Sequence, residues 1–271
     1  MRPRTVIGSA LLWAGALASG CGFDPPEVTG EPPGDGQVLG GVCDVAVDDH
    51  DIALYTFDDG SVVTIADRQQ RFNGAVVGGG ALAIPSIDGC GMALQFPATG
   101  TTYVEIPDRP EFHLDEGSIE LLVRTSDFSA LRGILSRDAA GSGQSGHLTL
   151  YEVVQGRIVL RVQDGGDMFL CSNQVFEPGT WVHVVINIGD PVELYLDGEK
   201  AASLEPVAVP ANGVCGESRA MSIAGNGNPW TLGGSQDMSD EGAATPFTGQ
   251  FRDGAVDHLR IRDTRRAVPN E

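Results

Sequence analysis

The stretch WVHVVINIGDPVELYLDGE, residues 181 to 199, decides the fold. Its first part alternates between aliphatic and other residues, and the aliphatic positions are Val182, Val184, Ile186 and Ile188. After a short turn the same period continues at Val192, Leu194 and Leu196, and the pair Asp197-Gly198 is typical of a hairpin turn. A period of two residues indicates strands that bury one face and leave the other wet. The stretch therefore predicts a pair of strands in an antiparallel sheet.

The same alternation recurs along the body of the chain, in SIELLVR (118–124), RIVLRV (157–162) and VDHLRIR (256–262). Glycine-rich turns separate these runs, and we find no amphipathic helix of 12 or more residues. No repeat is visible at a fixed period. Short strands with frequent turn signals predict an all-β fold, an antiparallel sandwich of two sheets.

The charge of the chain limits its partners. Its 271 residues contain 17 Lys and Arg against 37 Asp and Glu, which gives a net charge of -20. A nucleic-acid-binding protein usually presents a basic face, so we expect no nucleic-acid partner. The balance is compatible with an extracellular surface, with cation binding and with neutral glycans.

The N-terminus has the features of an export signal. A basic MRPR is followed by the apolar stretch 5–18, which is too short to span a membrane comfortably. Small residues directly before Cys21 resemble the bacterial lipobox, in which the peptidase cuts before a cysteine that becomes lipidated. The alternative is an ordinary cleaved secretory signal. We predict a signal peptide over residues 1–20 and a flexible linker over 21–40 that is lipid-anchored at Cys21 and rich in Pro, Gly and acids.

This prediction implies an exported protein, anchored through lipid to the outer membrane or cell surface of a bacterium. Four further cysteines, which allow three connectivities, then lie in an oxidising compartment. We favour the local pairs Cys43–Cys90 and Cys171–Cys215. Each closes a loop of about 45 residues, which the chain-entropy model values at about 4 kcal/mol.

A series of motifs resembles the laminin-G-like, concanavalin A-like jelly-roll domains of bacterial surface proteins. In chain order the motifs are ALYTFDDG (53–60), GCGMALQF (89–96), YVEIPDRPEF (103–112), SIELLVR, GILSRD (133–138), GHLTLY (146–151), GRIVLRVQ (156–163), GTWVHVVINIG (179–189), VELYLDGE (192–199) and AVDHLRIR (255–262). The resemblance implies a two-sheet jelly roll over residues 41–266.

That superfamily includes glycosidases as well as lectins, so the fold alone does not assign an activity. Glycosidases of this superfamily carry a Glu-x-Asp-x-x-Glu motif on one strand, which places two carboxylates on one face. We find no such spacing, and the histidines His147 and His183 are interpreted as strand residues with local hydrogen-bond partners. We therefore expect a protein that is not an enzyme, and a glycan-active enzyme with an unrecognised site remains an alternative.

Aromatic residues are the candidates for carbohydrate contact. We interpret Trp181 as a core residue, whereas Trp230 follows a loop and is a candidate for partial exposure. Tyr195 falls opposite Leu194 and Leu196 in the alternation, so we expect it on the wet face of the sheet. Tyr195 and Trp230 are thus the predicted ligand-binding residues.

Calcium is the candidate cofactor. Related domains often hold a structural calcium between an early acidic loop and the last strand, and the resemblance places its ligands at Asp58, Asp59, Asp67, Asn73 and Asp257. The alternative is turn chemistry, because Asp-Asp-Gly and Asn-Gly are ordinary turn formers. We leave both interpretations open.

The functional prediction is non-catalytic binding of a carbohydrate or a cell-surface protein. The alternative from another class is a structural or protein-interaction module that binds no glycan.

Overall fold

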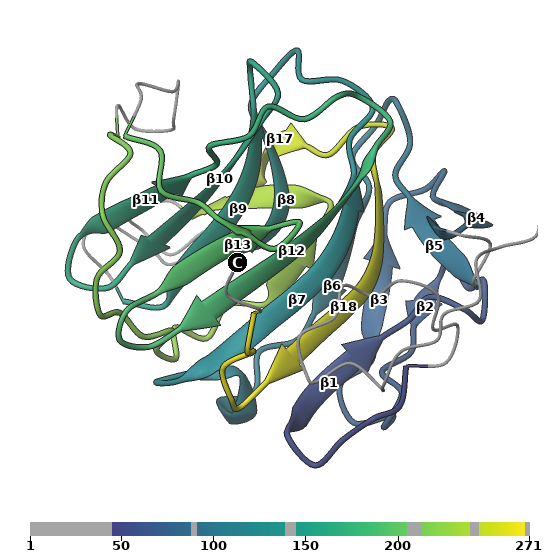
Figure 1. Ribbon diagram of the computed structural model, residues 1–271. Helices are drawn as coiled ribbons and strands as arrows, with labels where there is room; N and C mark the ends of the chain where they lie inside the picture. The colour runs from purple at the N-terminus through teal and green to yellow at the C-terminus, as the bar shows by residue number, and fades with distance from the viewer. Residues whose placement is uncertain (1–44, 88–90, 139–144, 205–212, 239–243, 269–271) are drawn as a thin grey trace, which may run out of the picture. The chain divides into compact units, whose positions relative to one another are not determined.

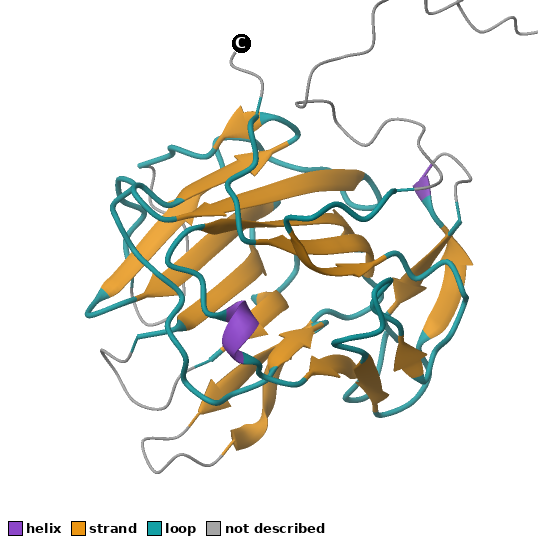
Figure 2. Cartoon of the chain, turned by 90° about the horizontal axis from the view of Figure 1, so that it is seen from below, coloured by secondary structure: helices purple, strands orange, loops and turns teal. Residues whose placement is uncertain are grey.

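The computed structural model describes residues 45–87, 91–138, 145–204, 213–238 and 244–268, with the side chains of 236–249 left out. Two sheets pack face to face, so the predicted all-β sandwich is confirmed (Figure 1). Helix is confined to short turns such as η2 (Pro110–Phe112), as Figure 2 shows. Within these ranges no helix is long and apolar enough to cross a membrane.

The first sheet has eight strands and contains both the first and the last strand of the domain. Its order is β14 (Glu199–Lys200), β13 (Glu193–Leu196), β12 (Trp181–Ile188), β7 (Gly117–Arg124), β18 (Ala255–Arg262), β5 (Met92–Gln95) and β4 (Leu82–Pro85), with β1 (Asp51–Tyr55) paired to β18. The pairs between these strands are antiparallel.

The second sheet has ten strands. Its order is β11 (Asp167–Cys171), β10 (Arg157–Gln163), β9 (His147–Val153), β8 (Arg132–Arg137), β15 (Trp230–Leu232), β6 (Tyr103–Ile106), β3 (Gly74–Val77) and β2 (Thr64–Ile65), with the pair β16 (Gly234–Met238) and β17 (Ala244–Gln250) attached to β8. The chain passes repeatedly between the sheets, for example from β6 to β7 to β8 and from β17 to β18, as in a jelly roll.

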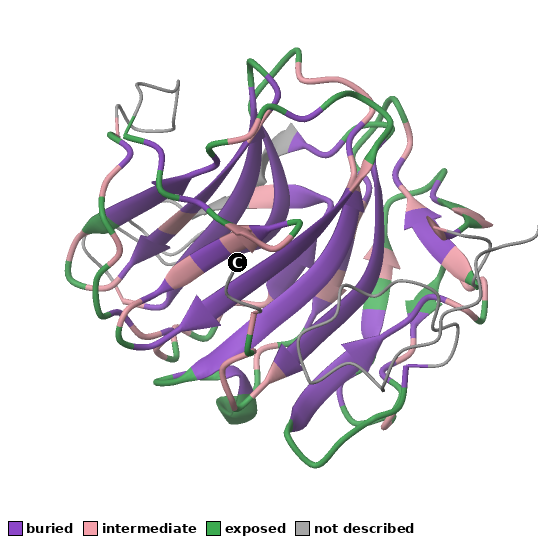
Figure 3. Ribbon diagram, in the orientation of Figure 1, coloured by how far each residue is buried: buried purple, intermediate pink, exposed green. Residues whose placement is uncertain are grey.

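The core lies between the sheets and is built from alternate residues of each strand. On β12 and β13 the buried set includes Val184, Ile186 and Leu194, as the period-two pattern predicts. Burying one such aliphatic side chain contributes about 1.5–3 kcal/mol. Figure 3 shows the result, because buried residues run along the strands and exposed ones along the loops.

A close approach inside the core explains one glycine. Gly233 has a φ of +91°, and a Cβ atom there would lie 2.2 Å from the ring of Phe96. Both facts exclude a larger residue at this position, where the chain leaves β15.

A segment around residues 213–223 closes one side of the sandwich. Its Cys215 forms a disulfide with Cys171 of β11, with a Cα–Cα distance of 5.7 Å, so this predicted pair is confirmed. Further along, Met221 and Ile223 pair with Gly189 and Leu114 beside the first sheet. The other predicted pair, Cys43–Cys90, lies outside the described residues, as do Cys21, the signal peptide and the linker.

Candidate ligand-binding face

The side of the eight-stranded sheet that points away from the core carries two accessible aromatic rings. We call this side the outer face and define it by Glu120, Leu122, Arg124, Trp181, His183, Val185, Asn187, Glu193 and Tyr195. These residues alternate with the core residues of β7, β12 and β13, and Val185 lies directly opposite Tyr195 in the pairing. Their side chains therefore project from one surface.

Trp181 lies on this face and not in the core, so its assignment to the core was wrong. Successive residues of a strand point to opposite faces. Val182 points into the core, so Trp181 and His183 on either side of it point outward. The indole is half-buried, and the guanidinium of Arg124, its cross-strand partner, lies 5.3 Å from the ring centroid. This arrangement is a cation–π contact.

Tyr195 lies where the alternation predicts it, half-buried on the outer face. Burial raises the pKa of its phenol, and the negative charge of Glu193 raises it further. Glu193 accepts hydrogen bonds from Lys200 at 2.6 Å and from Arg265 at 2.8 Å. A carboxylate whose charge is already paired with two cations therefore lies beside Tyr195.

The floor between the two aromatic rings is partly apolar and partly ionic. Leu122 and Val185 are buried there, and His183 Nε2 lies 2.7 Å from a carboxylate oxygen of Glu120. Burial of Glu120 raises its pKa, but the His183 hydrogen bond and the charge of Arg266 outweigh burial and leave the pKa lowered. Glu120 is therefore a buried, ionised carboxylate.

A second polar group lies further along the same sheet, at a bulge in β18. The pairing of β18 with β7 slips after Asp257, and His258 has a φ of +49°. Asp257 is 0% exposed and accepts hydrogen bonds from the hydroxyl of Ser86 and from the His258 amide at 2.7 Å. Burial, together with the charge of Asp58, raises the pKa of Asp257 to about 7. Bulges and strained residues of this kind concentrate at functional sites.

Asp257 bonds Ser86, directly after β4, and Asp58 bonds the Met92 amide at the start of β5, so these two predicted calcium residues contact the same pair of strands. An Asp58 oxygen accepts the Met92 amide at 3.2 Å. A Cβ on Gly91 would lie 1.7 Å from that oxygen, so only glycine fits beside it. Nearby, the Nδ1 atom of His258 is buried without a hydrogen-bond partner among the described residues, and burial lowers the pKa of this histidine.

The other three predicted calcium residues stabilise turns by accepting hydrogen bonds from backbone amides. Asp59 accepts the Ser61 amide at 2.9 Å, and Asn73 accepts the Asp67 amide at 3.0 Å. The Asp67 carboxylate is buried and accepts four backbone amides, those of Leu54, Gln69, Arg71 and Phe72. Its oxygens are therefore already used by the loop. Across the described ranges no group of three or more His, Cys, Asp and Glu residues is arranged to hold a metal ion.

Trp230 is 0% exposed, so its predicted role as an exposed ligand-binding residue is wrong. It lies opposite Ile106 on the core side of β15, and Arg137 lies 5.8 Å from its ring. A strand of three residues after a Gly/Asn-rich loop gives no alternation from which its direction can be predicted.

The two strand histidines have the local partners that the sequence predicted. His183 bonds Glu120, as described above. His147 on β9 bonds Asp138 through Nδ1 and lies 3.1 Å from the hydroxyl of Thr149 through Nε2.

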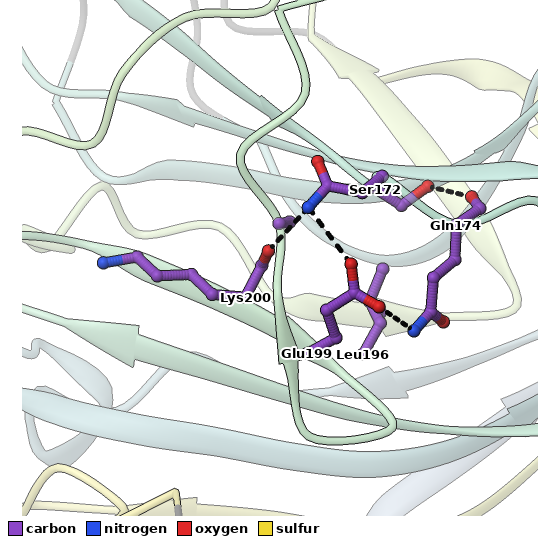
Figure 4. A pocket seen from close by; sticks show the side chains of 7 residues that line it. Ser172, Gln174, Leu196, Glu199 and Lys200 are labelled. Carbon is purple, nitrogen blue, oxygen red and sulfur yellow. Dashed lines mark hydrogen bonds between the residues drawn. The ribbon is translucent and has the colours of Figure 1, made fainter. Parts of the chain in front are cut away.

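A small hollow lies beside Lys200, where the chain leaves β11 and forms β14 (Figure 4). It has no room for a buried water molecule and is lined by Ser172, Asn173, Gln174, Leu196, Glu199, Lys200 and Ala201. The amides of Asn173 and Gln174 both donate to the Glu199 carboxylate, so its polar groups already satisfy one another. Ligand pockets usually measure about 300–1,000 Å³, and the outer face is therefore the better candidate site.

Solved structures with the same fold include several binding domains. Domain 4 of AbnA, a GH43 extracellular arabinanase from Geobacillus stearothermophilus in complex with arabinotriose, is 16% identical, with a TM-score of 0.54 over 80% of this chain and 94% of that chain. The binding domain of Paraclostridial Mosquitocidal Protein 1 is 12% identical, with a TM-score of 0.52 over 77% of this chain and 50% of that chain.

The binding domain of botulinum neurotoxin serotype G is 12% identical, with a TM-score of 0.51 over 79% of this chain and 48% of that chain. The chain thus spans about half the length of the two toxin domains. At these identities the likeness shows the fold.

No curated protein sequence matches the chain. A family model does match: that of the concanavalin A-like lectin/glucanases superfamily, over residues 98–267, which is more than half of the chain. The chain belongs to this superfamily.

Proposed function

We propose that the protein is a non-catalytic carbohydrate-binding lipoprotein and that its outer face holds the glycan. The observation that carries this proposal is the presence of two accessible aromatic rings, Trp181 and Tyr195, on one sheet surface. Aromatic faces provide large, rigid contact area, and polar groups around them fix orientation. The arabinotriose complex of the AbnA domain supports carbohydrate as the ligand class.

The spacing of the two rings suits a chain of sugars. Trp181 lies four residues along β12 from Val185, the cross-strand partner of Tyr195, which corresponds to about 13 Å of strand. That distance is longer than one sugar ring. An oligosaccharide that lies along β12 would contact both aromatic residues and pass over the strand between them, where Leu122 and Val185 are themselves buried.

The test is a glycan array followed by calorimetry on the glycan that binds. Replacing Trp181 or Tyr195 by alanine should weaken binding at least tenfold, because each change removes a stacking surface. The matched control is Tyr103→Ala, a half-buried tyrosine on β6 of the other sheet, which should leave affinity unchanged. A wild-type protein that binds no glycan, and instead captures one stable protein partner, would refute the proposal in favour of an interaction module.

A second candidate is a glycan-active enzyme, and one observation favours it. Glu120 and Asp257 lie on adjacent strands, and Asp257 is paired with Leu122, two positions along from Glu120. Their surroundings move the two pKa values in opposite directions, as in acid–base pairs of hydrolases. Against it, both carboxylates are almost fully buried. Release of shortened sugars from a bound glycan, abolished in Glu120→Gln, would establish this activity.

We further propose that calcium binds at the β18 bulge. Calcium prefers oxygen ligands, and the carboxylates of Asp58 and Asp257 are the residues that would hold it. A cation there would offset the burial and the repulsion by Asp58 that together raise the pKa of Asp257. Such an ion would stabilise the loop after β1 against the last strand.

A further inference from the structure

Arg124 differs from the other cations around the outer face, because no described carboxylate pairs with it. Its one described side-chain contact is the ring of Trp181. The remaining cations each have an acidic partner: Arg260 and Arg262 with Asp48 and Asp51, Arg265 and Lys200 with Glu193, and Arg266 with Glu120.

The chemistry of a half-buried arginine makes this difference informative. A guanidinium presents a planar fork of donors that matches a carboxylate, and partial burial strengthens such a bond. The ring of Trp181 holds the guanidinium plane in place without using up those donors in ion pairs. The guanidinium covers one face of the indole, so the pair offers the opposite face of the ring for stacking and the guanidinium donors for a carboxylate.

We propose that the Trp181–Arg124 end of the outer face binds a sugar that carries one carboxylate, such as a uronic or sialic acid. This inference rests on the proposed carbohydrate binding and specifies its ligand class. The sugar ring stacks on Trp181, and its carboxylate accepts hydrogen bonds from Arg124.

The charge of the chain favours a singly charged sugar over a polyanion. The net charge of -20 repels a polyanion such as a sulfated glycan along its whole length. Beyond about 10 Å that repulsion is screened at ordinary salt, so a single carboxylate held by Arg124 feels mainly the arginine. Asp127, three residues after Arg124, already binds Arg132, and Asp253, two residues before the Arg124 cross-strand partner Ala255, accepts a hydrogen bond from Gln95.

The face also has a direction. At its other end, beside Tyr195, the cations Lys200 and Arg265 are both paired with Glu193. A neutral sugar suits that end. The acidic unit therefore lies at Trp181, and the rest of the oligosaccharide runs along β12 toward Tyr195.

The test compares matched pairs of glycans that differ only by one acidic sugar. Lactose with 3′-sialyllactose, and xylobiose with its glucuronosyl derivative, are measured by calorimetry against the full-length protein. The acidic member of at least one pair should bind at least tenfold more tightly than its neutral counterpart.

Variants at Arg124 then separate charge from geometry. Arg124→Gln should weaken binding of the acidic glycan by about 30-fold, because charge-assisted hydrogen bonds are lost. Arg124→Lys keeps the charge but not the fork and should lose about tenfold. The matched control is Arg161→Gln, which removes a guanidinium that lies 5.8 Å from the ring of Phe169 on the other sheet, and it should change nothing.

Three results would overturn this inference. If the acidic and neutral members of each pair bind equally well, the protein binds carbohydrate but has no preference for an acidic sugar. Equal weakening of both members by Arg124→Gln, in a variant that melts like the wild type, would make Arg124 a support for Trp181 alone. Binding of none of the four glycans, with silence on the broader array, removes the proposed function and the inference with it.

Discussion

Asp257 is a buried carboxyl group whose protonation is changed by its surroundings. A buried carboxyl group with a pKa of about 7 is mostly protonated in the folded protein at acidic pH. Unfolding restores its ordinary pKa, so the unfolded chain loses this proton at a much lower pH. Without a cation, its contribution to stability is thus full below about pH 4 and is lost as pH rises to about 7.

We predict that Asp257→Asn abolishes this pH dependence. In the presence of a chelator, the free energy of unfolding of the wild type should fall by up to about 4 kcal/mol more than that of the variant between pH 4 and 8. Glu152, whose pKa burial raises to about 8, titrates in both proteins, so the difference between them isolates Asp257. Urea denaturation at several pH values measures it, and parallel curves would contradict the assignment.

Calcium should stabilise the wild type and have no effect on Asp257→Asn. Adding calcium should raise the melting temperature of the wild type above pH 6 and leave Asp257→Asn unchanged, because the variant lacks the charge that attracts the ion. A wild type that melts identically with calcium and with chelator has no such site. An equal shift in both proteins would place the ion elsewhere.

At the scale of elements, β11 depends on a covalent link. Cys171 joins it to Cys215, and their sulfurs belong to a small apolar cluster with Tyr151, Val159 and Phe169 on the far side of the second sheet. A Cβ on Gly213 would lie 2.2 Å from the Phe169 ring, so the segment before Cys215 passes directly over it.

We predict that Cys171→Ser with Cys215→Ser lowers the free energy of unfolding by about 3–4 kcal/mol. The unfolded chain regains the freedom of a closed loop with a sequence separation of 44. Chemical denaturation measures the loss, and wild-type protein under a strong reductant should lose at least as much. Val175→Ala, an exposed position near β11, is the control and should have no effect.

The elements also show what the sequence predicts and what it does not. Strands β7, β10 and β12 follow from alternation because their core-facing residues are aliphatic. The residues between them do not stay wet as the alternation predicts, since most of them are buried as well. The bulge at His258 does not follow, because it inserts a residue into a strand whose letters still alternate. The outward direction of Trp181 could be predicted, because it directly precedes the core residue Val182. The role of Asp67 as a hydrogen-bond acceptor could not, since its amide donors include Leu54, which is distant in sequence.

At the scale of the whole molecule, the proposed lipid anchor determines where the domain acts. Residues 1–20 carry two arginines and no acids, so removing them changes the net charge from -20 to -20 - 2 = -22. An acidic domain of this kind is not drawn to anionic lipid by its own charge. Membrane attachment would then depend on the lipid at Cys21.

We predict that Cys21→Ser releases the protein from membranes. Lipidation needs the thiol, so the variant should move from the membrane fraction to the soluble exported fraction on immunoblots. Ser19→Ala keeps a small residue before the cysteine and should remain membrane-bound. Retention of Cys21→Ser in the membrane fraction would contradict lipidation.

The pairing of β1 with β18 has a consequence for the order of synthesis and export. The last strand lies between β7 and β5 and also pairs with the first, so the eight-stranded sheet is interrupted until residue 262 has emerged. Contacts between such distant segments form slowly. In the export that the N-terminus predicts, a chain built in this way would complete this sheet only after its final strand had crossed the membrane.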